Sequence, residues 1–305
     1  LSMRTPMRYI NRYKINQAVL KINNETISNG EFKSNIADTY GASINGGAIY
    51  ASSATLAGSV FSTNTATSGN GGAAYFLEGN ISDSKFYGNT ALVGGAIYAS
   101  TITLNGSTFS GNIATTGDGG AIYVTNTASI NNAVFNNNIA TAGNGGAIYI
   151  TDSSTIKNSI FSGNKALSGN GGAIYNEGLW TTVQGGSFEN NQAINGGAVY
   201  APNIIHFTQT NFSQNNASGN GGAIYVTYPA TVTINGTSSL TNNTASGLGG
   251  AIYVNNGSLG LNTMGGTITF QGNRDSSGDN DIYLAGSSIM SIESDIDHQG
   301  TVNFY

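Results

Sequence analysis

The sequence predicts an all-β fold: a right-handed, single-stranded parallel β-helix of about ten coils of about 25 residues each. The composition and two repeated motifs lead to this prediction. Of 305 residues, 44 are glycine, 3 are proline and only 8% are charged. Good helix formers are scarce, and 39% apolar with 10% aromatic content argues against a disordered chain. The glycines must therefore have a structural role.

The first motif is Gly-Gly-Ala-Ile-Tyr, or a close variant of it. Its copies begin at Gly46, Gly71, Gly94, Gly119, Gly145, Gly171, Gly196, Gly221 and Gly249. They are 23 to 28 residues apart, and a degenerate tenth copy begins at Asp279. Paired glycines suit tight corners with positive φ and close backbone approaches. A period of this length is typical of one turn of a solenoid with three β faces.

The second motif, Phe-x-x-Asn, runs out of phase with the first, and equivalent residues would stack about 4.8 Å apart on successive coils. The phenylalanines are expected to fill the core, and the asparagines to bond to one another or to the corner backbone. This predicted ladder comprises Phe61, Asn64, Phe86, Asn89, Phe109, Asn112, Phe135, Asn138, Phe161 and Asn164. An apolar residue also precedes each phenylalanine by five positions, as Ile81 precedes Phe86. Two positions five apart have opposite parity, so a bend or bulge must lie between them.

The tyrosine of the first motif follows an apolar residue and often precedes another, and it is therefore expected to face outward. These tyrosines are Tyr50, Tyr75, Tyr98, Tyr123, Tyr149, Tyr175, Tyr200, Tyr225 and Tyr253. They predict either an exposed contact ladder for carbohydrate or protein, or rings that cover the edge of the core with only the hydroxyl in water. Trp180, the single tryptophan, predicts a local contact patch or a side chain packed beside a loop.

Three regions are expected: an N-terminal cap or arm over residues 1–26, repeats over 27–287, and an irregular last coil or cap over 288–305. Thr5-Pro6 predicts a short capping helix over the open edge of the first coil. Basic residues gather near the start and acidic residues near the end, so the ends could attract one another. The alternative is charged capping that keeps the ends apart. The residues for such end-to-end contact are Arg4, Arg8, Arg12, Asp279, Asp281, Asp295 and Asp297.

Several functional classes are disfavoured by the composition. The net charge of −5 argues against nucleic-acid binding, which needs clustered lysine and arginine. Without cysteine there is no thiolate site, and no apolar run is long enough to insert into a membrane. Central acidic residues are scattered, which predicts no enzyme and makes polysaccharide cleavage the least favoured function. No cofactor is expected, and calcium near Asp275–Asp281 is the alternative.

The pairing of Gly-Gly-Ala-Ile with Phe-x-x-Asn, from Phe32 to about Tyr283, resembles the repeat of the chlamydial polymorphic membrane proteins and of adhesin-like surface proteins in other bacteria and archaea. The resemblance implies the exported passenger of an autotransporter that acts in adhesion, although this chain lacks cysteine. We therefore expect an extracellular or cell-surface adhesive or spacer rod, exported by a signal or anchor outside this chain. Its partner would be a protein or glycan on a host or neighbouring cell. The alternative is a filament subunit whose partners are further copies of itself.

Overall fold

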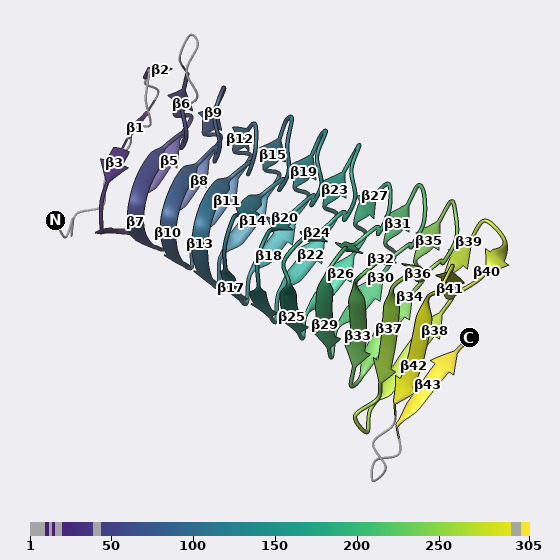
Figure 1. Ribbon diagram of the computed structural model, residues 1–305. Coiled ribbons are helices and arrows are strands. Elements are labelled where there is room, and N and C mark those ends of the chain that lie inside the picture. The colour runs from purple at the N-terminus through teal and green to yellow at the C-terminus, as the bar shows by residue number, and fades with distance from the viewer. Residues whose placement is uncertain (1–9, 12–13, 16–19, 39–43, 294–299) are drawn as a thin grey trace.

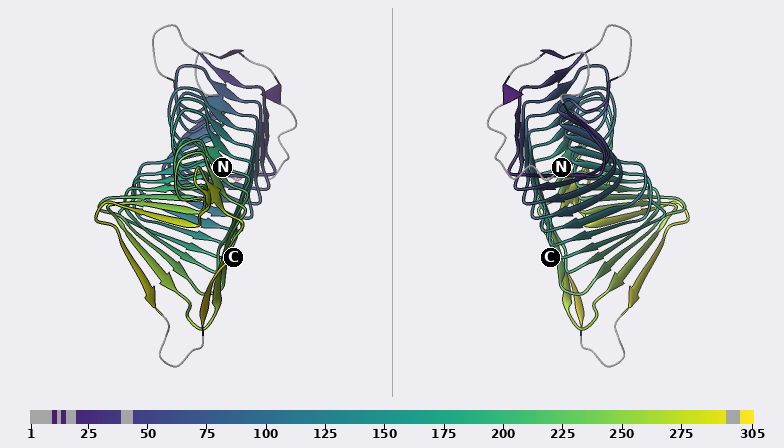
Figure 2. Two further views of the ribbon diagram at one scale, coloured as in Figure 1. Left: turned by 90° about the vertical axis from the view of Figure 1, so that its right-hand side faces the viewer. Right: turned by 90° about the vertical axis from the view of Figure 1, so that its left-hand side faces the viewer.

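The computed structural model describes residues 10–11, 14–15, 20–38, 44–293 and 300–305. Within these residues the chain forms a parallel β-solenoid and contains no helix, which confirms the predicted fold class. The coils stack from the N-terminal end of the molecule to the C-terminal end (Figure 1). Each coil passes through three β-sheets in turn, and two further views show the coils following one another from one end to the other (Figure 2).

Two of the sheets contain twelve strands each, with one strand from each coil except that β39 and β40 of sheet B come from the same coil. Sheet A consists of β1 (Ile10–Asn11), β5 (Glu31–Lys33), β8 (Val60–Ser62), β11 (Lys85–Tyr87), β14 (Thr108–Ser110), β18 (Val134–Asn136), β22 (Ile160–Ser162), β26 (Ser187–Glu189), β30 (Asn211–Ser213), β34 (Ser238–Thr241), β38 (Thr267–Gln271) and β43 (Thr301–Phe304). Sheet B consists of β2 (Lys14–Ile15), β6 (Ile36–Ala37), β9 (Thr65–Ala66), β12 (Thr90–Ala91), β15 (Ile113–Ala114), β19 (Ile139–Ala140), β23 (Lys165–Ala166), β27 (Gln192–Ala193), β31 (Asn216–Ala217), β35 (Thr244–Ala245), β39 (Arg274–Asp275) and β40 (Gly278–Asp279).

Sheet C is the widest sheet, and on most coils it has two segments. Its first segment contains the Ile-Tyr pair, and its second segment contains the apolar residue that lies five positions before the phenylalanine. Three strands span both segments: β7 (Ile49–Ala57), β10 (Ala74–Ser82) and β13 (Ile97–Asn105). The first segment also contains β3 (Leu20–Ile22), β16 (Ile122–Val124), β20 (Ile148–Ile150), β24 (Ile174–Asn176), β28 (Val199–Ala201), β32 (Ile224–Thr227), β36 (Ile252–Asn255) and β41 (Ile282–Ala285). The second segment also contains β4 (Glu25–Ser28), β17 (Ala128–Asn131), β21 (Ser154–Lys157), β25 (Trp180–Gln184), β29 (Ile204–Thr208), β33 (Thr231–Asn235), β37 (Ser258–Asn262) and β42 (Ile289–Glu293).

The corner between sheets C and A provides the predicted bend. Ile81 in β10 and Phe86 in β11 are both fully buried although they are five residues apart. Asp83, which lies between the two strands, has a φ of 48°, and this left-handed conformation turns the chain so that both side chains point inward. Asn, Gln or Gly occupies the same corner with positive φ on other coils, because polar residues of this kind and glycine tolerate that conformation better than apolar ones.

The phenylalanines form one continuous column in the core. Their rings stack on successive coils from Phe32 to Phe212, with centroids 4.7 to 5.0 Å apart and planes within 9° of parallel. Each ring is buried to 1% exposure or less, and Leu240 replaces phenylalanine on one coil without becoming exposed. The column buries a large apolar side chain on nearly every coil, which stabilises the stack.

The asparagines form a second buried column. Asn138 is typical: its Nδ2 donates to Asn164 Oδ1 at 2.9 Å and to the carbonyl oxygen of Phe109 at 3.1 Å. Its Oδ1 accepts hydrogen bonds from the backbone nitrogen and the Nδ2 of Asn112 at 3.0 and 2.9 Å. The asparagines from Asn64 to Asn243 in this way bond to the coil before and the coil after, and all asparagines of the column lie at 1% exposure or less.

The two glycines of the Gly-Gly pair have different roles. The first has positive φ, as at Gly145, where φ is 62°. The second lies against the next coil, so that a Cβ atom on Gly146 would lie 2.6 Å from the backbone nitrogen of Lys165. Such a distance is far inside van der Waals contact, so the second position requires glycine because of space and the first because of its backbone conformation.

The N-terminal end differs from the sequence prediction. Ile10–Asn11 and Lys14–Ile15 are strands that pair in parallel with β5 and β6, so the predicted capping helix is wrong at these residues. The remaining residues of that helix lie outside the described part of the chain. The open edges of β5 and β6 bind these short segments as strands, and this pairing overrides the local preference for helix. Parallel pairing in the solenoid register thus begins before residue 27.

The C-terminal end closes one sheet and leaves two open. In sheet B, β39 and β40 form an antiparallel pair, the one such pair among the described strands. In sheets C and A, strands β41, β42 and β43 continue the parallel register, and no further strand of the described chain pairs with them. The last coil is therefore partly capped and partly exposed.

Candidate functional site

The tyrosines of the first motif form a column on the outer face of the first segment of sheet C. On most strands the tyrosine lies between two buried apolar residues, as Tyr123 lies between Ile122 and Val124. Ten rings stack from Tyr50 to Tyr283, with centroids 4.8 to 5.5 Å apart. The column is thus a regular aromatic ridge along the rod.

The exposure of this column varies along the rod. Tyr50 and Tyr283 near the two ends are 38% and 36% exposed, whereas Tyr149 in the middle is only 8% exposed. Most of the other rings are half-buried because each ring covers the face of the next. The rings are therefore partly accessible toward the two ends of the column and almost fully covered in its middle.

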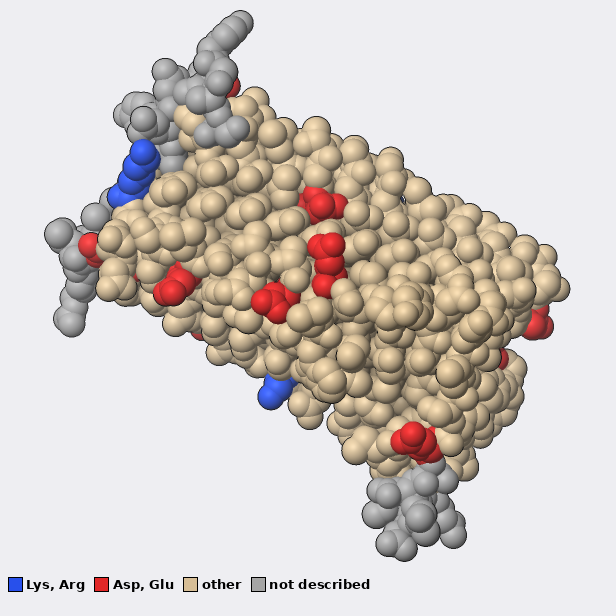
Figure 3. Space-filling view, viewed as in Figure 1, with Lys and Arg blue, Asp and Glu red and all other residues tan. Residues whose placement is uncertain are grey.

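Acidic side chains accompany the middle of the column. Tyr149 Oη donates a hydrogen bond to Glu177 Oε2 at 2.7 Å, from the next coil. Burial first, and then this bond and the negative charge of Asp118, raise the pKa of Tyr149. Burial and the same two carboxylates also contribute to raising the pKa values of Tyr123 and Tyr175 to about 12. Figure 3 shows acidic side chains on the face that carries sheet C and basic side chains only near its margins.

We expect these shifts to make the solenoid sensitive to alkali. The pKa values of Tyr123, Tyr149 and Tyr175 are higher in the folded state than their ordinary value of 10.0, so the folded state holds protons that the unfolded state releases above that pH. Stability should therefore be intact below pH 10 and should fall as the pH rises from 10 toward 12. Urea denaturation at a series of alkaline pH values measures this loss.

Glu177→Gln tests the cause of the shift. Removing the charge should lower the pKa of Tyr149, and an ultraviolet titration should show part of the tyrosinate forming at lower pH than in the unchanged chain. Glu189→Gln is the matched control, because Glu189 is exposed on sheet A. Identical titration curves for Glu177→Gln and the unchanged chain would contradict this assignment.

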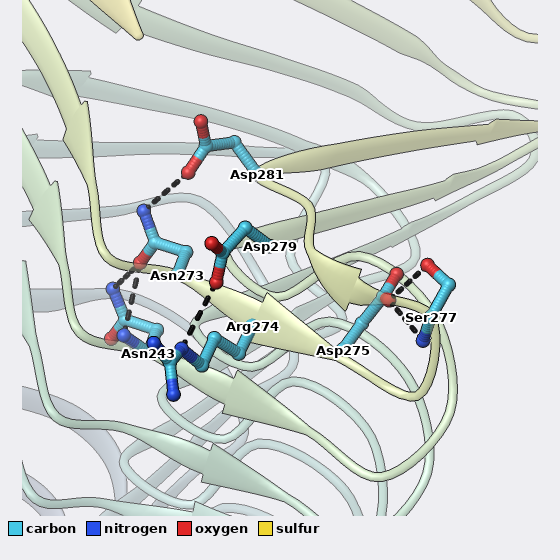
Figure 4. A network of polar contacts seen from close by, with 7 residues as sticks. All are labelled: Asn243, Asn273, Arg274, Asp275, Ser277, Asp279 and Asp281. Atoms are coloured by element: carbon cyan, nitrogen blue, oxygen red, sulfur yellow. Dashed lines mark hydrogen bonds and ion pairs between the residues drawn. The ribbon is translucent and has the colours of Figure 1, made fainter. Parts of the chain in front are cut away.

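The acidic side chains of residues 275–281, near the C-terminal end, already make hydrogen bonds and an ion pair within the chain (Figure 4). Asp275 Oδ1 accepts from the backbone nitrogen and the hydroxyl of Ser277, and Oδ2 accepts from the Gly249 nitrogen and Asn280 Nδ2. Asp279 pairs with the Nε of Arg274 at 3.0 Å. Protein donors thus already engage the carboxylates of Asp275 and Asp279, and the described residues contain no group of three or more acidic or histidine side chains able to hold a metal.

Asp281 ends the asparagine column. Its Oδ1 accepts from Asn273 Nδ2 at 2.7 Å, where another coil would place an asparagine (Figure 4). Burial raises the pKa of Asp281, the bond from Asn273 opposes this shift, and the charge of Asp279 adds to it. Asp279 and Asp281, two of the residues predicted for end-to-end contact, therefore already have partners within the chain. Arg4, Arg8, Arg12, Asp295 and Asp297 lie outside the described residues.

The last coil exposes apolar side chains that sequence reasoning missed. Leu284, Met290, Ile292 and Phe304 are 37% to 54% exposed, although they continue the register of the buried residues Val254, Leu259, Leu261 and Phe270. They are exposed because no strand of the described chain lies over them. The repeat could have predicted this exposed apolar surface, since these residues occupy positions whose side chains point inward on the earlier coils.

Among the described residues, no helix is long and apolar enough to cross a membrane. The Chlamydia polymorphic membrane protein repeat matches seven segments of the chain: 83–100, 106–125, 132–151, 158–177, 185–202, 209–227 and 237–255. Neither the curated proteins nor the solved structures include a match to the chain. The matched segments follow one another through successive coils of the solenoid, and each of them contains a phenylalanine or leucine, a column asparagine and a Gly-Gly pair. The chain therefore contains seven copies of the Chlamydia polymorphic membrane protein repeat, arranged in a parallel β-solenoid.

Proposed function

We propose that this chain is a non-enzymatic, adhesive rod displayed outside the cell, and that the face of sheet C makes the contact. The seven matched repeats and the continuous β-solenoid support a structural role at a surface. The observation that carries the proposal is the tyrosine column, which presents half-buried rings in register along the rod. Rigid rings with a polar tip give contact area at little cost in conformational entropy.

Binding of the purified chain to cultured cells, measured by flow cytometry, tests this function. Tyr50→Thr combined with Tyr75→Thr should reduce binding about tenfold if the column is the contact surface. Tyr87→Thr is the matched control, because Tyr87 is 37% exposed on sheet A, close to the 38% of Tyr50. Circular dichroism checks that each variant is folded. Binding by no cell type, or equal loss of binding with Tyr87→Thr, would contradict the proposal.

The surface of the last coil can be covered by a further coil of a longer chain or by a second copy of this chain, and the second case gives a second candidate function, end-to-end association into a filament. Unpaired strand edges and apolar side chains in core register form a surface that a further strand could cover. The contact would then be mainly apolar, so raising the salt concentration should preserve or strengthen it.

Electron microscopy of the purified chain at low and high salt distinguishes the two kinds of end contact. Filaments that persist in high salt and are lost with Ile292→Asp would support the apolar end. Ile160→Asp is the control, because Ile160 is 42% exposed on sheet A, away from the ends. Filaments that dissolve in salt would instead support charge attraction between the ends, and single rods at every concentration would contradict both.

A further inference from the structure

The second segment of sheet C presents a row of hydroxyl groups on its outer face. Thr103, Ser129, Thr155 and Thr182 occupy the same register position on four successive coils. Each lies directly before a buried apolar residue, and the four are half-buried or exposed. We call these four residues the hydroxyl row. Adjacent hydroxyls in the row lie on strands about 4.8 Å apart, so the row is periodic along the axis of the rod.

A second line of side chains runs beside the hydroxyl row and ends in tryptophan. Thr101, Thr127 and Ser153 take corresponding positions on three coils, and Trp180 takes that position on the fourth. Between the two lines lies an open groove of about 410 Å³. The groove thus has hydroxyl groups along both sides and the indole of Trp180 at one end.

The indole of Trp180 is supported from one side. Its ring lies 4.4 Å from the imidazole of His206 on the next coil, with a tilt of 50°. His206 Nδ1 in turn lies 2.6 Å from Thr233 Oγ1, which fixes the imidazole. Trp180 remains 51% exposed and lines the groove. The ring is therefore held in place while a large part of its surface is accessible.

The groove is uncharged. None of the side chains that line it is Asp, Glu, Lys or Arg. An acidic polysaccharide or a nucleic acid would require basic groups, and a protein contact of high affinity is usually centred on a larger apolar cluster. Hydroxyl groups both donate and accept hydrogen bonds, so they match a ligand that itself carries many hydroxyls. An aromatic ring beside them suits the apolar C–H face of a sugar ring.

From this arrangement we propose that Trp180 and the hydroxyl row form a binding groove for a neutral glycan that lies along the rod axis. Trp180 packs against one sugar ring, and the hydroxyl row bonds to the sugars that follow it on the preceding coils. This site names one chemical class of partner for the adhesive rod and rests on that proposed function for its biological setting. The tyrosine column lies on the other segment of the same sheet, so the two surfaces can be tested separately.

Because Trp180 is the only tryptophan in the chain, its fluorescence reports on the groove directly. Titration of the full chain with neutral oligosaccharides of hexose and N-acetylhexosamine should change this fluorescence in a saturable way. Acidic oligosaccharides of similar length should give no comparable change. A chain that responds to no neutral oligosaccharide, or better to the acidic set, would overturn the proposal.

Variants then locate the site by binding to immobilised glycans. Trp180→Ala should weaken binding about tenfold, and Thr155→Val should weaken it several-fold by removing one hydroxyl. Leu179→Ala is the matched control, because Leu179 is adjacent and 70% exposed but does not line the groove. Equal binding by Trp180→Ala and the unchanged chain would overturn the assignment, as would a Trp180-dependent contact with a cell-surface protein in the absence of glycan binding.

The cell-binding assay separates this proposal from the adhesive function. Cell binding that survives in Trp180→Ala, together with no glycan binding by the unchanged chain, would reject the groove and leave adhesion standing. Glycan binding that depends on Trp180, without binding to any cell, would reject adhesion and leave the groove standing.

Discussion

Asn138→Asp should destabilise the solenoid by about 3–5 kcal/mol at neutral pH, the cost of leaving a buried charge without a partner. The side chain of Asn138 is fully buried, and its Nδ2 donates to Asn164 Oδ1 and to the Phe109 carbonyl. An aspartate would direct an oxygen at these two acceptors, so two attractive contacts would become repulsive. Urea denaturation followed by circular dichroism measures the loss of stability.

The loss should depend on pH. Burial and the facing oxygen atoms should raise the pKa of the new carboxyl group above its ordinary value of about 4. The folded variant then holds a proton that the unfolded variant releases, so its stability should fall as the pH rises above about 4. Asn136→Asp is the control, since Asn136 lies on the neighbouring strand β18 and is partly exposed. A similar loss at both positions, or a loss that is the same at pH 4 and pH 7, would contradict the role of the column.

Gly146→Ala should cost about 4 kcal/mol or more, a loss found only for severe steric or polar defects. The new Cβ would collide with the carbonyl oxygen of Gly172 and lie 2.6 Å from the nitrogen of Lys165. Both atoms belong to the backbone of the next coil, which its own hydrogen bonds hold in place. The coil could accept the methyl group only by moving away from its neighbour. The midpoint of thermal unfolding should therefore fall sharply.

Gly111→Ala separates the effect of space from the effect of backbone conformation. Gly111 has a φ of 64°, but a Cβ there would meet no atom within 4 Å. Alanine should therefore cost only the strain of the left-handed conformation, about 1–2 kcal/mol. If the two variants lost the same stability, the close approach of coils at Gly146 would not be the reason for the second glycine of the motif.

The fold could be predicted from the sequence because the same two motifs recur on nearly every coil. The spacing of the Gly-Gly pairs predicts the coil, and the five-residue offset from Ile81 to Phe86 requires the bend that Asp83 makes. Neither inference depends on a single residue. Stacking then carries each local preference along the rod, so that local and global signals agree.

The ends and the outer faces were harder to predict, for physical reasons. Around Ile10 a helical spacing of apolar residues competes with the open edge of β5, and the edge prevails. The carboxylate that accepts the hydrogen bond of Tyr149 belongs to Glu177, a residue of the next coil outside the repeated motif. The proximity of the hydroxyl row to Trp180 could be predicted only with the exact strand register, because that register makes neighbours of residues about 26 positions apart in the sequence.

The direction of the hydrogen bonds gives the rod a mechanical character. The bonds between coils, including those of the asparagine column, run along the rod axis. A force that pulls the two ends apart acts along the hydrogen bonds between each pair of adjacent coils. The coils should therefore detach one at a time rather than all together. Each detached coil of about 25 residues releases roughly 80–90 Å of extended chain. A surface rod of this construction would lengthen under tension and absorb the energy of a pull while its remaining coils stay folded.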